Sequence, residues 1–330
     1  MITLHQSWQL IAEKSLRGEL ITLEEGLRII ESNDEELLDI LQAAFIVRKH
    51  FYGKKVKLNL ILNAKSGLCP EDCGYCSQSI ISKAPIDKYP LLEKNIIVDG
   101  ARKAMELQVG TYCIVASGRG PTSKELDQVI EAVQEIKSTM PMKICTCLGI
   151  LTQEQADRLK AAGVDRYNHN LNTSEKNFAN ITSTHTYEDR VHTVEKVKRS
   201  GISPCSGVII GMGETNEDIV HMAYALRELD ADSIPINFLN SIPGTPLENK
   251  KELNPRKCLK VLALMRFINP SKEIRVAGGR EVNLRSLQPL ALYAANSVFV
   301  GDYLTTAGQE ALEDHKMIED MGFEIEVCAL

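Results

Sequence analysis

Short apolar or β-branched runs alternate with longer amphipathic segments from about residue 56 to residue 321 of this 330-residue chain. A buried strand followed by a helix is the repeating unit of parallel sheets. We predict strands at residues 56–63, 111–116, 143–148, 164–171, 204–210, 233–239, 273–277 and 297–301. We expect helices near residues 93–109, 122–138, 153–162, 187–200, 215–229, 255–268, 284–294 and 306–321. Eight units without a break in composition predict an α/β fold, a closed parallel (β/α)8 barrel of the TIM type, ahead of an open doubly wound sheet.

The segment before the first predicted strand reads as helical. Thr22 followed by Glu25 is a capping-box pattern, and residues 35–49 carry apolar side chains on one broad face. No catalytic residue types are grouped there. We therefore predict an N-terminal helical extension over residues 1–50, and a barrel with a C-terminal tail over residues 51–330.

Composition narrows the class of protein and its surroundings. A net charge of -6 makes a nucleic acid an unfavourable partner. The first residues lack the basic start and apolar core of a signal peptide, and no stretch has the apolar length of a membrane span. We expect a cytoplasmic protein without a membrane partner. In a reducing compartment its nine cysteines are thiols or metal ligands rather than disulfides.

Three cysteines, Cys69, Cys73 and Cys76, follow the first predicted strand with the spacing CxxxCxxC. Three thiolates on one short loop can bind three irons of a 4Fe-4S cluster and leave the fourth iron free for chemistry. Structural zinc usually takes four ligands from paired CxxC units, and no second pair occurs here. An iron-sulfur electron carrier would need a fourth cysteine near the first three. Both are weaker alternatives.

Four further candidates lie on different predicted strands: Cys113, Cys145, Cys205 and Arg275. A single buried cysteine is commonly a small hydrophobic residue. Three of them on separate strands of one barrel, beside a cysteine-rich loop, favour a second metal site. Cys147 lies two residues beyond Cys145 and points the same way on an ideal strand, so it is a rival ligand.

Neutral polar residues end two other predicted strands. Asn170 and Asn172 belong to a dense polar segment at residues 167–174, and Asn237 ends the strand at residues 233–239. Such groups can orient ribose hydroxyls or a ureido ring without adding charge. A hydrogen-bonded turn explains Asn172 nearly as well. His169, in the same segment, would by itself most often be structural.

Five segments match one known family: CPEDCGYCSQS at 69–79, YNHNLNTS at 167–174, PCSGVIIGMGET at 204–215, SIPINF at 233–238 and RVAGGRE at 275–281. Together they resemble the biotin synthase family of radical S-adenosylmethionine (SAM) enzymes. The resemblance extends from roughly residue 51 to residue 303 and covers nearly the whole predicted barrel. It implies an enzyme that inserts sulfur into dethiobiotin to form biotin, the last step of biotin biosynthesis.

The resemblance also implies roles for individual residues. Cys69, Cys73 and Cys76 would bind the 4Fe-4S cluster, with SAM on its open iron. A second cluster, 2Fe-2S, would be bound by the set that the family pattern selects: Cys113, Cys145, Cys205 and Arg275. Contacts to SAM or to dethiobiotin would come from Tyr75, Ala116, Ser117, Gly118, Asn170, Asn172, Ile209 and Asn237. Many family members carry aspartate where this chain has Asn172, which would replace a charged ribose contact by a neutral one.

Partners follow from the same resemblance. The implied substrate is dethiobiotin, the implied electron donor is a flavodoxin or ferredoxin, and a homodimer is usual for the family. The nearest alternative is a radical SAM barrel enzyme without sulfur insertion, such as a mutase. It would keep Cys69, Cys73 and Cys76 but would need none of the three strand cysteines.

Overall fold

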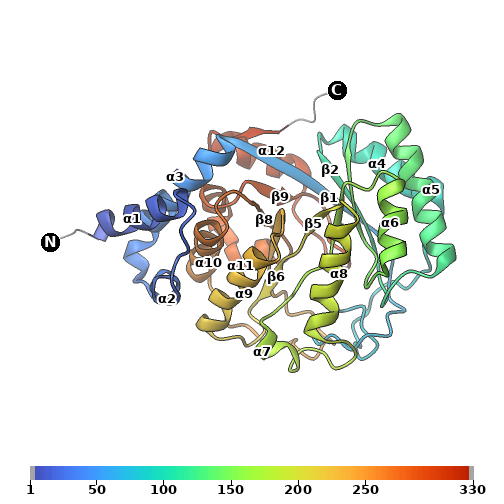
Figure 1. Cartoon of the computed structure of the whole chain (residues 1–330), viewed down its shortest axis with the longest axis horizontal. Helices are drawn as coiled ribbons and strands as arrows, with labels where there is room; N and C mark the ends of the chain where they lie inside the picture. The colour runs from blue at the N-terminus through green and yellow to red at the C-terminus, as the bar shows by residue number, and fades with distance from the viewer. Residues whose placement is uncertain (1–3, 327–330) are drawn as a thin grey trace.

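A closed ring of parallel strands forms the centre of the molecule (Figure 1). The computed structural model of the chain describes residues 4–326. The ring runs in the order β1 (Lys55–Lys65), β2 (Thr111–Ala116), β3 (Lys143–Cys147), β4 (Arg166–Asn168), β5 (Ser203–Cys205), β7 (Ser233–Phe238), β8 (Glu273–Val276) and β9 (Ser297–Phe299). Because β9 pairs with β1, the ring is closed. The predicted barrel is confirmed, and the open sheet is excluded.

The fifth predicted strand, residues 204–210, is not continuous. It divides into β5 and β6 (Val208–Ile210), and β6 pairs with β7 outside the main path of the ring. Gly207 lies at the break, where an added Cβ atom would come within 1.9 Å of the Pro235 carbonyl oxygen. Only glycine allows two backbones to approach so closely. This contact depends on a distant strand, so the local sequence pattern could not reveal it.

Helices surround the ring: α4 (Lys94–Glu106), α5 (Ser123–Thr139), α6 (Gln153–Ala161), α8 (Tyr187–Arg199), α9 (Asn216–Glu228), α10 (Pro255–Ile268) and α12 (Ala311–Asp320). Four of them begin with a capping box in which a threonine caps the first turn, at Thr122, Thr152, Thr186 and Thr215. Each box satisfies amide donors that would otherwise lack partners at the helix start. Short elements complete the outer layer: α7 (Glu175–Phe178) and β10 (Glu324–Ile325), which pairs with β1.

Two predicted helices differ from those observed. The segment expected at 284–294 is α11 (Arg280–Leu284) followed by the 3-10 helix η2 (Arg285–Tyr293), which contains Pro289. Proline lacks the amide hydrogen that a continuous α-helix needs, so an α-helix through this position is unfavourable. The helix expected at 306–321 begins only at Ala311.

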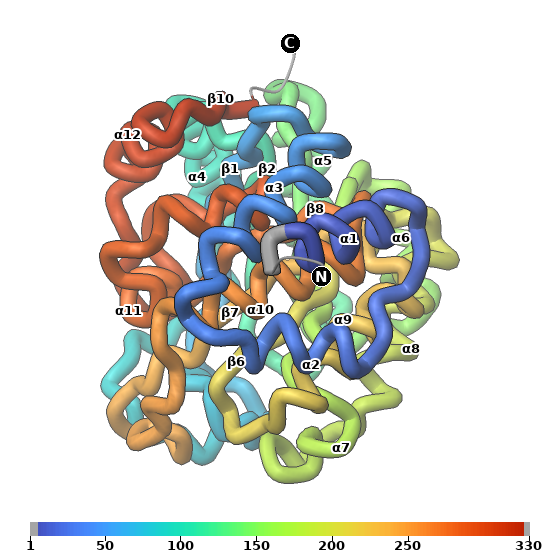
Figure 2. Tube along the Cα trace, turned by 90° about the vertical axis from the view of Figure 1, so that its left-hand side faces the viewer, coloured from blue at the N-terminus to red at the C-terminus, as the bar shows by residue number. Residues whose placement is uncertain are grey.

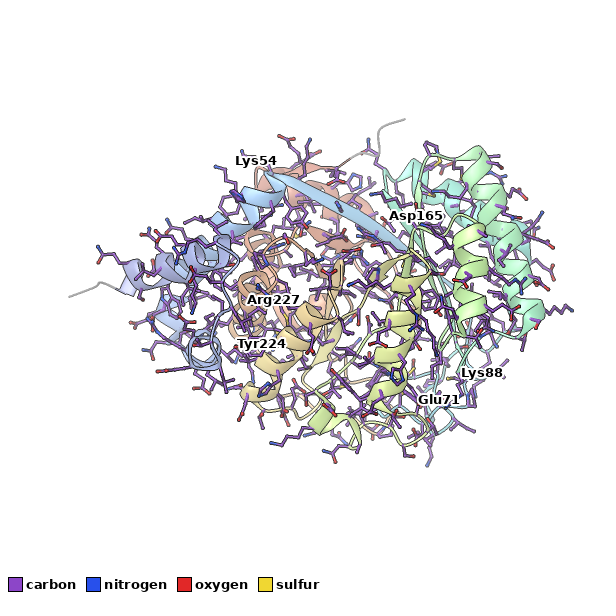
Figure 3. The ribbon with its side chains drawn as sticks, in the orientation of Figure 1. Lys54, Glu71, Lys88, Asp165, Tyr224 and Arg227 are labelled. Carbon is purple, nitrogen blue, oxygen red and sulfur yellow. The ribbon has the colours of Figure 1, made fainter. Side chains whose placement is uncertain are left out.

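The N-terminal segment forms α1 (Leu4–Leu16), α2 (Leu23–Glu31), η1 (Asp34–Glu36) and α3 (Leu37–Tyr52). Figure 2 shows these helices lying across α9 and α10, outside the ring. The capping box from Thr22 to Glu25 is present, as predicted. Figure 3 labels Tyr224 and Arg227 on α9, which donate hydrogen bonds to the carbonyl oxygens of Ile21 and Gly18 at 2.6 and 2.8 Å. The extension therefore packs as part of one core with the barrel helices.

The two ends of the barrel can be told apart in Figure 3. Lys54, which precedes β1, and Asp165, which precedes β4, lie toward the upper end, whereas Glu71 and Lys88 lie toward the lower end. The loop after β1 is therefore at the C-terminal end of the strands, where TIM barrels carry their active sites. Within residues 4–326, no helix combines the length and the apolar character needed to cross a membrane.

Candidate active site

A cavity of about 320 Å³ opens at the C-terminal end of the barrel and reaches down into its lumen. Its lining includes nearly every residue that the sequence predicts for the site: Cys69, Cys73, Tyr75, Cys76, Cys113, Ala116, Ser117, Gly118, Cys145, Asn170, Asn172, Ile209, Asn237 and Arg275. The exception is Cys205, which is fully buried behind this wall. Residues from all parts of the barrel sequence thus meet at one cavity.

The loop that carries the first three cysteines, residues 66–79, is here called the cysteine loop. Two acidic residues between its cysteines hold it against residues 181–185. The Asp72 carboxylate accepts hydrogen bonds from the hydroxyl of Thr182 at 2.6 Å and from the amide of Ser183 at 2.9 Å. The Glu71 carboxylate lies 2.6 Å from the hydroxyl of Thr184 and 2.5 Å from Nδ1 of His185. These side chains act as a latch between two loops, so their role here is positional.

The thiols of the cysteine loop lie at the mouth of the cavity. Cys73 is buried, and Cys69 and Cys76 are half-buried. Burial raises the pKa of the Cys73 thiol, while the positive charge of Arg190 opposes that rise. Metal binding requires the thiolate form, and cationic iron favours it when bound. Three thiols on one loop at an open cavity fit a cluster that leaves one iron accessible to a ligand.

The deep cysteines form a layer inside the barrel, defined here as Cys113, Cys145 and Cys205. Cys113 and Cys145 are direct neighbours across β2 and β3, and all three are at most 4% exposed. Contact with the Cys113 thiol, together with burial, raises the pKa of Cys145 well above its ordinary value. Contact with Cys145 does the same for Cys205. Three thiols on three strands, with Cys145 in contact with each of the other two, fit a second iron-sulfur site.

Cys147 also lines the cavity, as the sequence pattern allows. Burial is the main cause that raises the pKa of its thiol to about 12, and the Cys205 charge adds to the rise. Cys145 is in contact with both Cys113 and Cys205, whereas no contact with Cys113 bears on Cys147. This difference supports Cys145 as the third member of the deep layer.

A site for one metal ion is not formed by these side chains. Within the described part of the chain, no three His, Cys, Asp or Glu residues converge as ligands of one ion. A zinc site would need such convergence. In a 4Fe-4S cluster each of three thiolates binds its own iron, and in a 2Fe-2S cluster the ligands are divided between two irons, so neither cluster needs three ligands on one ion. Cys258 is buried on α10, and Cys328 lies outside the described residues.

Arg275 lies beside the deep cysteines, on β8. Its Nη1 atom is 4.0 Å from the sulfur of Cys205, and its Nη2 atom is 2.6 Å from the carboxylate of Glu273. Burial alone would lower the pKa of the Arg275 guanidinium, but the Glu273 carboxylate raises it above its ordinary value. Arg275 is therefore a cation at this position.

Two asparagines present amides to the cavity from different strands. Asn170 follows β4, and its Oδ1 accepts hydrogen bonds from the amide of Gly207 at 3.0 Å and from Asn168 at 2.9 Å. Asn237 lies on β7, where its Oδ1 accepts from the amide of Gly278 at 3.0 Å. Backbone contacts thus fix both side chains, and each amide keeps hydrogen-bonding capacity for a ligand.

Asn172 has a left-handed backbone with φ of 70°, a conformation that asparagine tolerates better than most residues. With its amide oxygen turned inward, the side chain accepts from the Tyr75 hydroxyl at 2.6 Å and from Arg190 at 3.2 and 3.3 Å. Asn172 is only 4% exposed. It therefore connects the cysteine loop to α8 as well as lining the cavity.

An apolar surface suited to a flat ring lies at the mouth. Tyr75 and Ile209 pack against a small cluster made by Ile181, Met212 and Leu239. Just after the end of β2, the Ser117 amide donates to the carbonyl oxygen of Lys65, the last residue of β1, at 3.0 Å. Residues 116–118 thus run beside the cysteine loop and line the cavity.

Several residues of the site were not predicted. Arg190 lines the cavity and donates to the carbonyl oxygen of Asn170 at 2.9 Å. It lies near the start of α8, where the helix dipole disfavours a cation. This unusual position was the one sequence signal that could have marked Arg190 as a functional residue. Glu71, Asp72 and His185 form the latch, but nothing in the local pattern distinguishes them from solvated charges. His169 also lines the cavity, and burial holds its pKa well below the ordinary value.

Comparison with known proteins agrees with this geometry. The family described as Radical SAM superfamily matches residues 65–225, and the Biotin and Thiamin Synthesis associated domain matches residues 235–324. Biotin synthase from Bacillus subtilis (strain 168) is 66% identical over 97% of this chain and 95% of that protein. Biotin synthase from Bacillus pumilus (strain SAFR-032) is 65% identical over 98% of both chains. This chain belongs to the biotin synthase family.

Membership of the family makes the chain a radical SAM enzyme, and this class implies a 4Fe-4S cluster and SAM as cofactors. Solved structures agree on the fold. Methylornithine synthase superposes with a TM-score of 0.84 at 18% identity, over 96% of this chain and 97% of that one. The FeFe-hydrogenase maturase HydG from Carboxydothermus hydrogenoformans gives 0.82 at 19% identity, over 98% and 80%. At these identities the likeness supports the barrel alone.

Proposed function

We propose that this enzyme converts dethiobiotin to biotin by SAM-dependent sulfur insertion, with the sulfur supplied by an auxiliary 2Fe-2S cluster. The observation that carries the proposal is the layer of Cys113, Cys145 and Cys205 beneath a cavity whose mouth bears a second set of three cysteines. A radical SAM enzyme without sulfur transfer has no need for the deep layer. The names and identities of its relatives support the same reaction.

The two cysteine sets would hold different groups. Cys69, Cys73 and Cys76 would bind the 4Fe-4S cluster, and the deep layer with Arg275 beside it would bind the 2Fe-2S cluster. When bound, the first cluster and SAM supply a radical able to remove hydrogen from an unactivated carbon, and the second cluster supplies sulfur. No acid or base of the protein could break such a C-H bond. The side chains therefore bind and orient the two small molecules and exclude water.

The cavity walls would orient the two small molecules. Tyr75 and Ile209 offer an apolar surface for adenine, and residues 116–118, which line the cavity beside the cysteine loop, would contact the methionine part of SAM. Asn170 and Asn237 are suited to the ureido ring of dethiobiotin, because their fixed amides can donate and accept without adding charge. Asn172 would reach SAM through a neutral hydrogen bond.

The protein would also protect the reaction. The deep cysteines are at most 4% exposed, and the lumen around them closes toward the N-terminal end of the barrel. Excluding water and external thiols keeps a reactive carbon centre from being quenched. The electron donor, a flavodoxin or ferredoxin, and the homodimer and cytoplasmic location stay predictions of the family resemblance.

The test is the iron and sulfide content of anaerobically reconstituted protein, with Mössbauer spectra before and after incubation with SAM, reductant and dethiobiotin. We expect two distinct clusters and loss of the 2Fe-2S signal as biotin forms. If only a 4Fe-4S cluster assembles, and SAM is cleaved without any second cluster, the assignment of Cys113, Cys145 and Cys205 to a 2Fe-2S cluster is wrong. A radical rearrangement enzyme would then be the better description.

A further inference from the structure

An apolar patch, defined here as Leu68, Ile80 and Ile81, is exposed to solvent beside the cysteine loop. The three residues are 61, 68 and 47% exposed. Leu68 directly precedes Cys69, and Ile80 follows Cys76 by four residues. Consecutive Cα atoms are about 3.8 Å apart, so Leu68 and Ile80 lie within about 15 Å of the Cα atom of a cysteine that would bind the 4Fe-4S cluster. The patch thus belongs to the same chain segment as the cluster ligands.

The backbone of Leu68 is strained. Its φ is 56°, a left-handed conformation that glycine adopts at little cost and that a bulky side chain disfavours. The neighbouring Gly67 is fixed from two sides, because its amide donates to Oε1 of Gln78 at 2.9 Å and its carbonyl oxygen accepts from the Ser117 hydroxyl. Since the Leu68 side chain is mostly exposed, packing within the fold does not explain why leucine stands here. Strain of this kind indicates a functional contact.

The residues that follow the cysteines fold back against the cysteine loop. The amide of Ile80 donates to the carbonyl oxygen of Glu71 at 3.0 Å. The side chain of Lys88 covers Gly67, where an added Cβ atom would come within 2.7 Å of Lys88 Cγ. Figure 3 shows Lys88 and Glu71 at the same, lower end of the barrel. An exposed lysine therefore adjoins the residue before Leu68.

The charge of this face differs from that of the whole chain. Residues 66–90, together with the half-exposed Arg119 that pairs with Glu71 at 3.2 Å, have no net charge, whereas the chain has a net charge of -6. The carboxylates of Glu71 and Asp72 are engaged in the latch, and Asp87 is exposed. The three cations of this face are Lys83, Lys88 and Arg119. An acidic partner is thus repelled less here than by the average surface of this protein.

We propose that the apolar patch, with Lys83 and Lys88 near it, is the surface on which an acidic one-electron carrier protein docks to reduce the 4Fe-4S cluster. One electron leaves the carrier, which is oxidised, and enters the cluster held by the cysteine loop, which is reduced. No bond forms or breaks in this step. Electron-transfer complexes are transient and bury little surface, so a small apolar centre with a charged rim is sufficient. This inference rests on the proposed function and adds the place where its electron enters.

The experiment compares the double variant Ile80→Gln and Ile81→Gln with Leu312→Gln in full-length protein. Leu312 is a matched control, because it is 69% exposed and lies on α12, outside the cysteine loop. The probe is a purified flavodoxin. Calorimetric titration gives its affinity for iron-free and for anaerobically reconstituted protein. Stopped-flow absorbance gives the rate of cluster reduction by reduced flavodoxin and, separately, by dithionite.

The double variant should bind flavodoxin at least about 10-fold more weakly, because it removes apolar surface that docking would bury. Reduction by flavodoxin should slow by a similar factor. Reduction by dithionite, a small molecule that needs no docking surface, should keep the wild-type rate. Leu312→Gln should match wild type in all measurements. Unchanged flavodoxin affinity and reduction rate in the double variant would overturn the proposal.

Two further outcomes are distinguishable. Size-exclusion chromatography of the same proteins tests a second copy of the chain as the occupant: loss of self-association with retained flavodoxin affinity would make the patch a contact between copies and overturn the proposal. An acidic ferredoxin is titrated in the same way, and if neither carrier binds wild-type protein, the proposal is wrong. Failure of the proposed function is seen separately, as dithionite-reduced wild type that forms no biotin from SAM and dethiobiotin.

A second variant covers the case in which the double variant does not fold. Leu68→Asn removes the apolar side chain and keeps a residue that tolerates the left-handed backbone. Its thermal stability should equal or slightly exceed that of wild type, while iron-free protein should bind flavodoxin several-fold more weakly. A stable Leu68→Asn protein with wild-type affinity for flavodoxin would overturn the role of Leu68 in docking.

Discussion

The two cysteine sets of this barrel are held in different ways. Cys69, Cys73 and Cys76 lie on a loop at the cavity mouth, and the latch of Glu71 and Asp72 fastens that loop to residues 181–185. Cys113 and Cys145 pair across β2 and β3, and Cys205 lies on β5, which is separated from β3 by β4, so backbone pairing around the ring sets their spacing. A loop can leave one side of its site open to ligands, whereas strands of a closed barrel give a rigid and dry site.

Charge separates the two sets as well. At the mouth, the carboxylates of Glu71 and Asp72 accept hydrogen bonds from hydroxyls and amides. Arg190 is the nearby cation, and its charge opposes the rise in the pKa of Cys73. Inside the barrel, Glu273, Arg275 and Arg166 form a buried ionic network, in which Lys57 is the partly exposed partner of Glu273. The comparison teaches that a site open to exchangeable ligands can be held by partly exposed polar contacts, whereas a dry site inside the barrel needs buried groups that are paired.

The largest expected effect comes from the mouth. Cys73→Ala should reduce SAM cleavage by roughly 10³-fold or more, about 4 kcal/mol in activation free energy, because no side chain can replace the lost iron ligand. The measurement is 5'-deoxyadenosine formed under reducing anaerobic conditions. The deep cysteines are untouched, so the variant should still show a 2Fe-2S spectrum. Loss of both clusters together would mean that the two sites do not form independently.

The next prediction distinguishes the deep cysteines from those of the cysteine loop. Cys145→Ser should abolish biotin formation while SAM cleavage continues, because a hydroxyl is a poor substitute for a thiolate at iron. Cys147→Ser is the matched control, two residues along the same strand, and should keep most of the biotin yield. Biotin and 5'-deoxyadenosine are quantified in the same reactions. The opposite ranking of the two variants would make Cys147 the ligand.

A smaller effect is expected for the latch. Asp72→Asn should lower the free energy of unfolding by about 1–2 kcal/mol, because it weakens several hydrogen bonds to a partly exposed carboxylate. It should also lower the apparent affinity for SAM, since the loop position becomes less fixed. Thermal unfolding and SAM titration check both effects. Asp87→Asn is the control, an exposed aspartate outside the latch, and similar losses in both variants would argue against a latch.

The smallest effect lies outside both cysteine sets. Asp218, in the first turn of α9, accepts hydrogen bonds from Ser174 at 2.8 Å and from the Thr215 hydroxyl at 2.7 Å. Burial alone would raise its pKa, but these bonds and the Thr215 amide lower it below the ordinary 3.8. Because the folded pKa is lowered, this carboxylate stabilises the fold above about pH 4, and the gain is lost as pH falls further.

Asp218→Asn should therefore cost about 1 kcal/mol at pH 7 and progressively less below pH 4. The measurement is thermal unfolding of wild type and variant, both freed of iron, followed by circular dichroism from pH 7 to pH 3. A difference between the two proteins that stays constant over this range would show that the carboxylate charge is not the cause.

Much of the fold could be predicted because its signals are local. Strands such as β2 and β7 are short apolar runs, and the capping boxes at Thr22 and Thr152 are visible within four residues of sequence. The exceptions have distant or special causes. The break between β5 and β6 depends on Gly207 meeting Pro235 of another strand, and the irregular segment around Pro289 depends on a missing amide hydrogen.

The site divides in the same way. By itself the sequence determined the residue types and spacing: three thiols on a loop after β1, further thiols on β2, β3 and β5, and amides at two strand ends. Only the tertiary structure decided that Arg190 reaches the cavity, that Glu71 and Asp72 fasten two loops, and that Glu273 joins three cations below the deep cysteines. The physical reason is that barrel closure creates long-range pairings, such as Asp72 with Thr182 at 110 positions apart and Glu273 with Arg166 at 107 positions apart, and no local pattern records them.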